Sequence, residues 1–386
     1  SVNCGQGSKD VASANADGNG IGTFEYAVPT GFLALCSANL PEPTIGPNAA
    51  EQADDYFNTV LYTGDGTTSR SITGVGFAPD FVWGKCRSNA EDHILSDTVR
   101  GANKKLESNN TGAEDTSTAA TLSGFESDGF TGPSSTPGNI NVNGRTYVAW
   151  NWKAGGTAVS NTDGSITSSV SAAPDAGFSI CTWTGNGTSG ATIGHGLSSA
   201  PEFIIGKNRT DGGTTWAVYA EPAGNGYLEL NSTAAYVNGS FGFNNTDPTS
   251  TVFTVDGSGL NTNAKNYIAY CFHSVDGYSK VGSYVGNANA DGTFVYTGFS
   301  PAFVILKAST VALNWLMYDN ARNEYNVIDN TLYPNLSNAE ATGTASIDFL
   351  SNGFKIRNSG NYINQSGQTF IYLAFAEAPF KYANAR

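Results

Sequence analysis

Three lysines recur at one point of a repeated phrase, and their type and position suit ligand binding. Lys85, Lys207 and Lys307 each close an apolar, strand-like run that follows a proline: FAPDFVWGK, SSAPEFIIGK and FSPAFVILK. A lysine at this position can hydrogen-bond a carboxylate-bearing sugar or pair with an acidic group across a subunit interface. We favour a structural interpretation, in which the stem of each lysine covers an aromatic ring and its ammonium group reaches water.

Two tryptophans form a second candidate binding surface. Trp150 and Trp152 lie two positions apart in AWNWKAGG, so a strand would present both on one face, opposite Tyr147 and Ala149. Two indole rings on one face can stack on sugar rings. We favour the alternative that they are buried in an interface between neighbouring units, because aromatic bulk drives such contacts.

The histidines and carboxylates do not form a catalytic pattern. Three histidines occupy different points of the repeated phrases: His93, His195 and His273. The sequence has no GxSxG, HExxH or Walker motif. A glycosidase needs only two carboxylates at a suitable separation, and Asp80, Asp97 and Glu126 are candidates. Since 33 acidic residues provide such pairs by chance, we expect that the protein is not an enzyme.

No cofactor is predicted. Turns such as ADGNG (16–20) and YTGDG (62–66) offer oxygen ligands for Ca²⁺, but neither has the full ligand spacing of an EF-hand loop. Five cysteines lie far apart, without a Cys-x-x-Cys or Cys/His cluster: Cys4, Cys36, Cys86, Cys181 and Cys271. Their spacing predicts no metal site.

Composition and charge exclude several classes of protein. The 386 residues carry a formal net charge of −14, which repels nucleic-acid phosphates and anionic membrane surfaces. No apolar run approaches the roughly 18 residues that a membrane-spanning helix needs. Only 13% of residues are charged, and Gly, Asn, Ser and Thr are abundant, which is typical of short strands joined by tight turns. We predict an all-β protein that binds no nucleic acid and does not insert into membranes.

The candidate residues lie in phrases that the chain repeats three times. Each copy begins with an aromatic residue and a glycine-rich turn, as in LYTGDG, CTWTGNG and GSYVGNA. Each copy ends in a line that opens with an asparagine and has an aromatic residue six positions later: NVNGRTYVAW, NTNAKNYIAY and NQSGQTFIYL. We predict that the asparagine caps a turn by bonding its own backbone and that the ring anchors a core. The three pairs are Asn141 with Tyr147, Asn261 with Tyr267, and Asn364 with Phe370.

These phrases predict three tandem β-sandwich units, at residues 56–157, 178–277 and 278–386, because each copy is domain-sized and rich in strand and turn signals. Residues 158–177 are rich in Gly, Ser and Thr, as linkers are, although their Val and Ile residues also suit an added edge strand. The second and third units follow one another without a linker, so we expect them to pack firmly. Residues 1–55 are predicted to be an N-terminal extended segment.

Many phrases within residues 56–386 resemble a repeated domain of phage tail-fibre and other virion proteins. The resemblance rests on APDFVWGKCRSNAEDHILSDTVRG, GFESDGF, NGRTYVAWNWKAGG, DGYSKVGSYVGNANADGTFVYTGFSPAFVILK and IDFLSNGFKIRNSGNYINQSGQTFIYLAFAEAPFKYANAR. It implies a concanavalin A-like or jelly-roll type of sandwich, and it carries no catalytic motif. VNCGQG and GTFEYAVPTGFLALCSANLPEPTI, in residues 1–55, resemble the C-terminal end of a SPRY-like domain. This implies an arm or a domain remnant, and a chain that is the C-terminal part of a longer virion protein.

The resemblance implies a non-enzymatic bacteriophage protein with structural and adhesive function, synthesised in the host cytoplasm and located in the virion. In a tail fibre or a capsid-attached fibre, its lectin-like domains would contact host surface glycans. The implied partners are further copies of the chain, as a homotrimer, and other virion proteins. Two alternatives stay open: a glycan depolymerase of a tail spike, and a filament or capsid-decoration subunit without a ligand.

Overall fold

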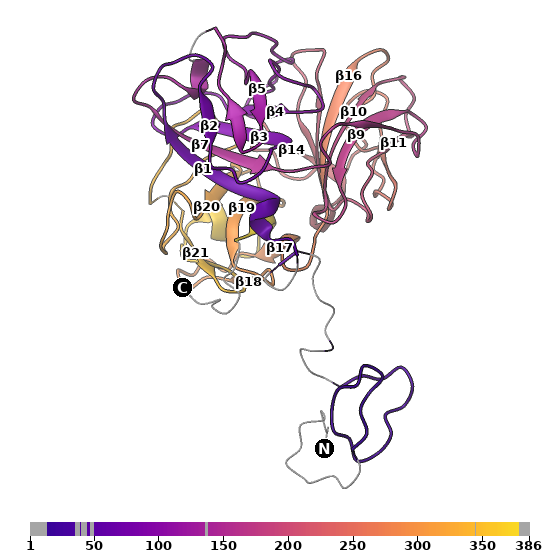
Figure 1. Cartoon of the computed structure of the whole chain (residues 1–386). Coiled ribbons are helices and arrows are strands. Elements are labelled where there is room, and N and C mark those ends of the chain that lie inside the picture. The colour runs from indigo at the N-terminus through magenta and orange to yellow at the C-terminus, as the bar shows by residue number, and fades with distance from the viewer. Residues whose placement is uncertain are drawn as a thin grey trace. The chain divides into compact units, whose positions relative to one another are not determined.

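The computed structural model describes residues 14–34, 39, 45–46, 50–135, 138–343 and 345–377. They belong to two compact units, Ser1–Pro43 and Thr44–Arg386 (Figure 1). The boundary divides the predicted N-terminal segment 1–55, because Ile45 and Ala53 bury their side chains in the core of the larger unit.

The described part of the smaller unit is organised around one carboxylate. Asp17 accepts hydrogen bonds of 2.6–2.9 Å from the backbone N–H groups of Asn19, Ile21 and Ala34 and from the Asn39 side chain. These bonds, led by the one from Ala34, lower the pKa of Asp17 to about 2. The carboxylate therefore stays ionised and holds the loops together.

The regular secondary structure of the larger unit consists almost entirely of antiparallel strands, so the all-β prediction is confirmed. Each of the three main sheets packs against a smaller sheet. We call the three resulting two-sheet units sandwich 1, sandwich 2 and sandwich 3. The finer prediction of a concanavalin A-like or jelly-roll type stays a prediction.

The strands of each sandwich follow here in their order across the sheets. Sandwich 1 has a main sheet of β1 (Phe57–Thr63), β7 (Thr146–Trp152), β3 (Phe81–Cys86) and β4 (Ile94–Asp97), and a small sheet of β2 (Ser71–Thr73), β6 (Gly129–Thr131) and β5 (Gly124–Glu126). Sandwich 2 has a main sheet of β14 (Gly224–Glu229), β13 (Ala217–Ala220), β12 (Phe203–Asn208), β16 (Asn266–Phe272), β10 (Phe178–Thr184), β9 (Ser168–Ala173) and β8 (Val159–Asn161), and a small sheet of β11 (Ala191–Gly194) and β15 (Val252–Val255). Sandwich 3 has a main sheet of β17 (Ser279–Val285), β23 (Thr369–Ala376), β19 (Pro301–Ala308) and β20 (Leu316–Asp319), and a small sheet of β18 (Phe294–Tyr296), β22 (Gly353–Ile356) and β21 (Ile347–Leu350).

The helices of the described residues are short. η2 (Ala53–Asp55) precedes β1, and three others connect strands: η3 (Gly138–Ile140), η4 (Glu221–Ala223) and α1 (Asn361–Asn364). Within the described ranges, no helix is long and apolar enough to cross a membrane.

One strand order occurs in all three main sheets. The order β1-β7-β3-β4 of sandwich 1 returns as β10-β16-β12-β13 and as β17-β23-β19-β20. Sandwich 2 is wider because β8 and β9 extend its main sheet beyond β10 and β14 extends it beyond β13. The predicted linker 158–177 is therefore corrected: most of it forms a hairpin on the open edge of β10, which is the alternative that its Val and Ile residues suggested.

The repeated asparagine joins distant parts of each sandwich. Asn141 Nδ2 donates to Asp65 Oδ1 and to the Thr67 carbonyl, at 2.9 and 2.8 Å, and the Asp65 backbone N–H donates to Asn141 Oδ1 at 3.2 Å. Corresponding bonds join Asn261 to the turn at 186–188 and Asn364 to the turn at 287–289. The predicted local turn cap is thus corrected, because each amide holds the glycine-rich turn after the first strand of its sandwich.

The aromatic partner of each asparagine stacks on an aromatic residue of that first strand. The ring centroids lie 5.1–5.4 Å apart in three pairs: Tyr62 with Tyr147, Trp183 with Tyr267, and Tyr284 with Phe370. The predicted role of the ring as a core anchor is confirmed.

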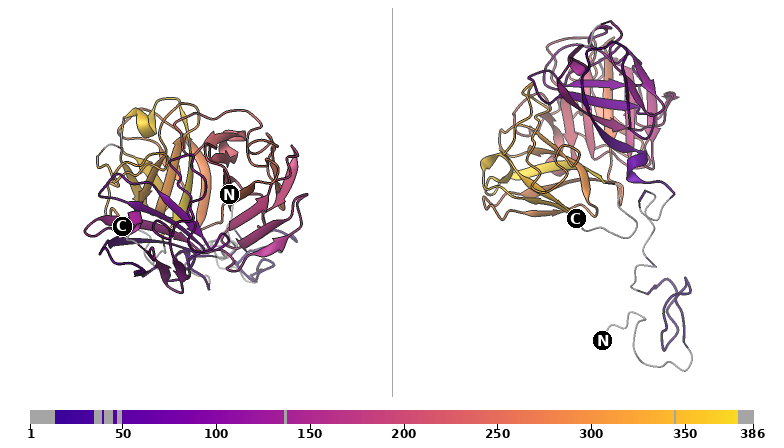
Figure 2. Two further views of the ribbon diagram at one scale, coloured as in Figure 1. Left: turned by 90° about the horizontal axis from the view of Figure 1, so that it is seen from above. Right: turned by 60° about the vertical axis from the view of Figure 1, so that its left-hand side comes forward.

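The three sandwiches contact one another in a closed ring. A backbone N–H of each sandwich donates to a carbonyl of the next, at 2.8–2.9 Å: Glu114 to Arg209, Tyr236 to Ser309, and Glu340 to Arg87. The left view of Figure 2 shows the violet, pink and orange-yellow strand groups around a common centre. The largest hydrophobic cluster draws side chains from all three main sheets, so the ring is filled by shared core.

Candidate functional site

The structure places the three recurring lysines inside the ring. Lys85, Lys207 and Lys307 are at most 1% exposed. Lys85 Nζ donates to the Ser337 carbonyl of sandwich 3 at 3.1 Å, and Lys307 Nζ donates to the Thr233 carbonyl of sandwich 2 at 3.2 Å. Lys207 Nζ donates to the carbonyl and hydroxyl of Thr214, in its own sandwich.

Burial changes the chemistry of these ammonium groups. Desolvation lowers the pKa of each of the three lysines to about 8. Their stems are packed, as we favoured, but their heads bond backbone carbonyls rather than water. The lysines join neighbouring segments of one chain, and a sugar carboxylate at the surface does not reach them.

Both predicted tryptophans lie in the core between sandwiches. Trp150 and Trp152 are buried, and Trp150 Nε1 donates to Asp319 Oδ2 of sandwich 3 at 3.0 Å. The ring centroid of Trp152 lies 5.9 Å from Phe303 and 5.6 Å from Phe375, both also in sandwich 3. Their position matches the interface interpretation, and neither indole face is open to a sugar.

Two of the three carboxylates considered for glycoside hydrolysis are closed to solvent. Asp80 accepts bonds from the backbone N–H groups of Ala154 and Gly156 at 2.8 and 3.2 Å. Asp97 Oδ2 accepts from Arg100 Nε at 2.5 Å and from the Tyr270 hydroxyl at 2.8 Å.

The third carboxylate, Glu126, accepts bonds from the hydroxyls of Ser71 and Thr131 on its own small sheet. All three carboxylates thus have protein partners, and the bonds of Asp80 and Asp97 hold turns and neighbouring sandwiches together.

The histidines take structural positions as well. Trp83 Nε1 donates to His93 Nδ1 at 2.9 Å, so His93 Nε2 carries its proton and donates to the Tyr333 carbonyl of sandwich 3 at 3.0 Å. Burial lowers the pKa of His93 well below its usual value and that of His195 to about 4. His273 Nδ1 lies 2.9 Å from the carbonyl of the adjacent Ser274. Among the residues that the structure describes, no three His, Cys, Asp or Glu side chains are grouped to hold a metal ion.

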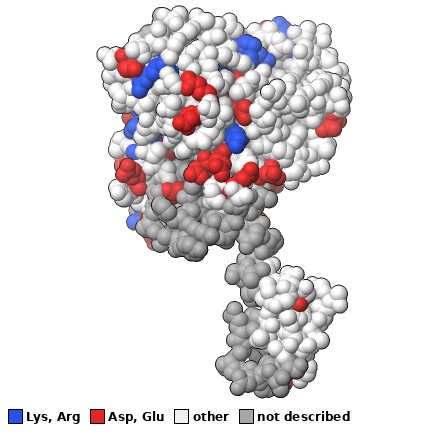
Figure 3. Space-filling view, viewed as in Figure 1, with Lys and Arg blue, Asp and Glu red and all other residues white. Residues whose placement is uncertain are grey.

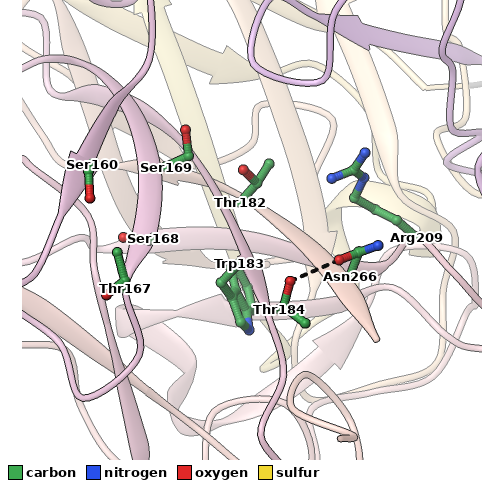
Figure 4. A pocket seen from close by; sticks show the side chains of 9 residues that line it. All are labelled: Ser160, Thr167, Ser168, Ser169, Thr182, Trp183, Thr184, Arg209 and Asn266. Carbon is green, nitrogen blue, oxygen red and sulfur yellow. Dashed lines mark hydrogen bonds between the residues drawn. The ribbon is translucent and has the colours of Figure 1, made fainter. Parts of the chain in front are cut away.

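An open, polar groove of about 350 Å³ lies on the main sheet of sandwich 2 (Figure 4). Nine residues line it: Ser160, Thr167, Ser168, Ser169, Thr182, Trp183, Thr184, Arg209 and Asn266. Strands β8, β9, β10 and β16 supply all of them except Thr167, which precedes β9, and Arg209, which follows β12. None is acidic, which distinguishes the groove within a chain of net charge −14.

Strand register aligns the hydroxyls of the groove. Ser160 on β8 lies opposite Ser169 on β9, and Ser169 lies opposite Thr182 on β10. Because neighbouring strands are about 4.8 Å apart, the three hydroxyls form a row across the sheet. Figure 4 shows their side chains following one another, with Arg209 beyond Thr182.

The row is free to bond a ligand. Ser160 and Ser169 are exposed, Thr182 is half-buried, and none of the three hydroxyls has a protein partner within the described ranges. Beside the row, the Thr184 hydroxyl donates to Asn266 Oδ1 at 3.0 Å.

Glu114 neutralises the charge at the end of the row. Arg209 forms two hydrogen bonds with this carboxylate, at 2.8 and 2.9 Å. The groove therefore offers mainly neutral donors and acceptors. On the face of the larger unit shown in Figure 3, charged side chains likewise stand in small groups among an uncharged surface.

The sequence did not predict this groove, because SITSSVS (165–171) lies entirely within the predicted linker 158–177. A signal was present in Thr167 and Ser169, which lie two positions apart as the outward positions of a strand do. The pairing of β9 with β10 depends on the open edge of sandwich 2, which the local pattern does not reveal.

A family model described as a domain of unknown function, DUF7483, matches residues 52–379. No curated protein and no solved structure matches the chain. The matched residues include all three sandwiches and the groove. The chain therefore belongs to the DUF7483 family.

Proposed function

We propose that this protein is a non-enzymatic structural and adhesive component of a bacteriophage virion, and that the groove of sandwich 2 contacts host surface glycans. The observation that carries the proposal is the row of Ser160, Ser169 and Thr182, whose hydroxyls have no partner among the described residues. Each hydroxyl offers one donor and two acceptor positions, which complement the hydroxyls of a sugar.

The form of the groove favours a chain-like ligand. It lies along a sheet surface and crosses β8, β9, β10 and β16, so several sugar residues can lie along it. Ordered water can bridge such a polar contact with little loss of affinity. No carboxylate lines the groove, so an acidic glycan would meet no repelling charge among the lining residues.

The ring supports adhesion because it holds the groove on rigid elements. Arg209, at one end of the groove, is fixed by Glu114 of sandwich 1. A preorganised surface loses less conformational entropy when it binds. The proposed virion location, the homotrimer and the other virion partners rest on the phage resemblance of residues 56–386.

A binding experiment with matched variants tests the proposal. The triple variant Ser160→Ala, Ser169→Ala and Thr182→Val removes the row of hydroxyls. Each lost hydrogen bond contributes about 0.5–1.5 kcal/mol, so we expect affinity for host envelope polysaccharide to fall by at least about tenfold.

Ser283→Ala is the matched control. Ser283 on β17 pairs with Ile371 as Thr182 pairs with Ile268, but β17 has no added hairpin beside it. We expect this variant to bind as the wild-type protein does. Equal binding by the triple variant, or no binding of any glycan by the wild-type protein, contradicts the proposal; the second result favours a decoration subunit without a ligand.

A further inference from the structure

A loop of sandwich 3 presents an aromatic side chain almost entirely to solvent. Tyr325 is 81% exposed and Val327 is 44% exposed, at the tip of the loop that follows β20. Sandwich 1 closes the corresponding loop with a bridge between Leu95 and Leu106, whereas sandwich 3 closes it between Met317 and Leu332. The loop is therefore longer in sandwich 3, and the additional residues form this tip.

Hydrogen bonds fix the loop on both sides of the tip. At its base, the Asn330 backbone N–H donates to Asn323 Oδ1 at 2.9 Å, and Asn330 Nδ2 donates to the Arg322 carbonyl at 3.0 Å. Beside the tip, Asn326 Nδ2 donates to the Phe349 carbonyl at 2.7 Å, and the Phe349 N–H donates to Asn326 Oδ1 at 2.8 Å. The exposed aromatic ring thus stands on an anchored segment.

A cleft of about 230 Å³ lies beside the ring, and its lining combines apolar and polar groups: Asn320, Glu324, Tyr325, Asn326, Ile328 and Phe349. The buried side chains of Ile328 and Phe349 form an apolar floor. The half-buried side-chain amide of Asn320 has no protein partner in the described part of the chain. An apolar cleft with a few polar groups is the usual form of a small-ligand site.

We propose that this cleft binds one neutral pyranose residue of a glycan. The apolar face of the sugar ring packs on Tyr325, and its hydroxyls bond the Asn320 amide and the Glu324 carboxylate. The carboxylate of Glu324, which lines the cleft, disfavours a sugar that carries a carboxylate. The inference rests on the proposed function, glycan binding, but assigns a second site in another sandwich.

The size of the site favours a sugar over a protein partner. Tyr325 and Val327 are the exposed apolar residues of the tip, whereas a specific protein interface buries about 800 Å² on each partner. Tyrosine suits the role because it supplies a large, rigid contact area with a polar end.

Saturation-transfer NMR on the full chain tests the inference. The probes are the methyl glycosides of glucose, galactose, mannose and N-acetylglucosamine, with methyl glucuronide as the acidic comparison. We expect at least one neutral glycoside to bind and methyl glucuronide to bind at least tenfold more weakly. Tyr325→Ala should weaken the binding of the neutral glycoside at least tenfold, and Asn320→Ala should also weaken this binding.

Two controls separate the possible failures. Tyr362→Ala removes another exposed tyrosine of sandwich 3, and the groove variant of Ser160, Ser169 and Thr182 tests the other site; both should bind the monosaccharide as the wild-type protein does. Unchanged monosaccharide binding by Tyr325→Ala overturns the inference. The inference is also overturned if native mass spectrometry shows that Tyr325→Ala has lost self-association while its sugar binding is unchanged.

A measurement of polysaccharide binding shows whether only the sugar site in the cleft is wrong or the proposed function is wrong as well. If wild-type protein binds host polysaccharide through the groove but no monosaccharide, the cleft assignment is wrong and the proposed function stands. If it binds neither, both are wrong.

Discussion

At the scale of single residues, buried polar side chains connect segments that are distant in sequence. Asn261 Nδ2 donates to Asn186 Oδ1 and to the Thr188 carbonyl, both at 2.8 Å, and the Asn186 N–H donates to Asn261 Oδ1 at 2.9 Å. The amide is fully buried, so its loss leaves these groups without a partner.

We therefore expect Asn261→Ala to lower the free energy of unfolding by about 2 kcal/mol, since two or more net hydrogen bonds are lost. Urea unfolding followed by tryptophan fluorescence measures this difference. The exposed neighbour Asn263→Ala should change stability by less than about 0.5 kcal/mol. Equal effects of the two substitutions would show that the amide does not hold the turn.

The buried lysines predict a dependence of stability on pH. The pKa of Lys307 is about 8 in the folded chain, below its ordinary value of 10.5. Between these two values the unfolded chain binds more protons, so this lysine makes the free energy of unfolding rise with pH. Its contribution is bounded by about 1.4 kcal/mol for each pH unit.

Comparison with Lys307→Met isolates this contribution, because other titrating groups are common to both proteins. From pH 8 to pH 10, the stability of the wild-type protein should increase relative to that of the variant. Below about pH 7, where Lys307 is protonated in both the folded and the unfolded chain, the difference should be constant. A difference that stays constant through pH 10 would mean that the buried lysine keeps its ordinary pKa.

At the scale of elements, the hairpin β8–β9 creates the groove, and its turn is tightly packed. A side chain at Gly164 would clash with the backbone oxygen of Thr192 on β11. Gly164→Ala should therefore lift the hairpin away from the small sheet, with a loss of stability of about 1–3 kcal/mol.

Hydrogen exchange of residues 159–173 measures this loosening, and binding of host polysaccharide should weaken with it. Gly132→Ala is the control, because its added carbon would meet the Arg70 oxygen at an ordinary 3.5 Å. Unchanged exchange in the Gly164 variant would show that the hairpin does not depend on this contact.

The positions of the strands were easier to predict from the sequence than the segments that each strand contacts. The apolar run FVWGK and the asparagine line became β3 and β7 because their local composition suits strands wherever the sheet lies. The role of Lys85 was not predictable in this way, since its partner Ser337 lies 252 residues later. The groove was missed for the same reason: Ser160, Ser169 and Thr182 form a row only through pairing register.

At the scale of the whole molecule, ring closure joins the three sandwiches into one body. Arg322 supports this closure: its Nε donates to Asp319 Oδ2 at 2.6 Å, and the same oxygen accepts from Trp150 of sandwich 1 at 3.0 Å. Arg100 and Asp97 make the equivalent contact with Tyr270 of sandwich 2.

We expect Arg322→Met to lower the free energy of unfolding by about 3–5 kcal/mol, because Asp319 is left as an unpaired buried charge. The larger unit should still unfold in a single transition, since one hydrophobic cluster runs through all three sandwiches. Calorimetry and fluorescence measure both properties. Arg357→Met removes an ion pair of an arginine that is 41% exposed. This substitution should lower the free energy of unfolding by less than about 1 kcal/mol. Separate transitions for the sandwiches would contradict the shared core.

The central claim is that the hydroxyl row of sandwich 2 is the surface that contacts a glycan. Hydrogen–deuterium exchange of the intact chain, with and without host envelope polysaccharide, tests it most directly. We predict protection concentrated in residues 159–184, with no change in the corresponding edge strand β17 (Ser279–Val285). Protection that avoids residues 159–184, or no protection at saturating polysaccharide, would contradict it.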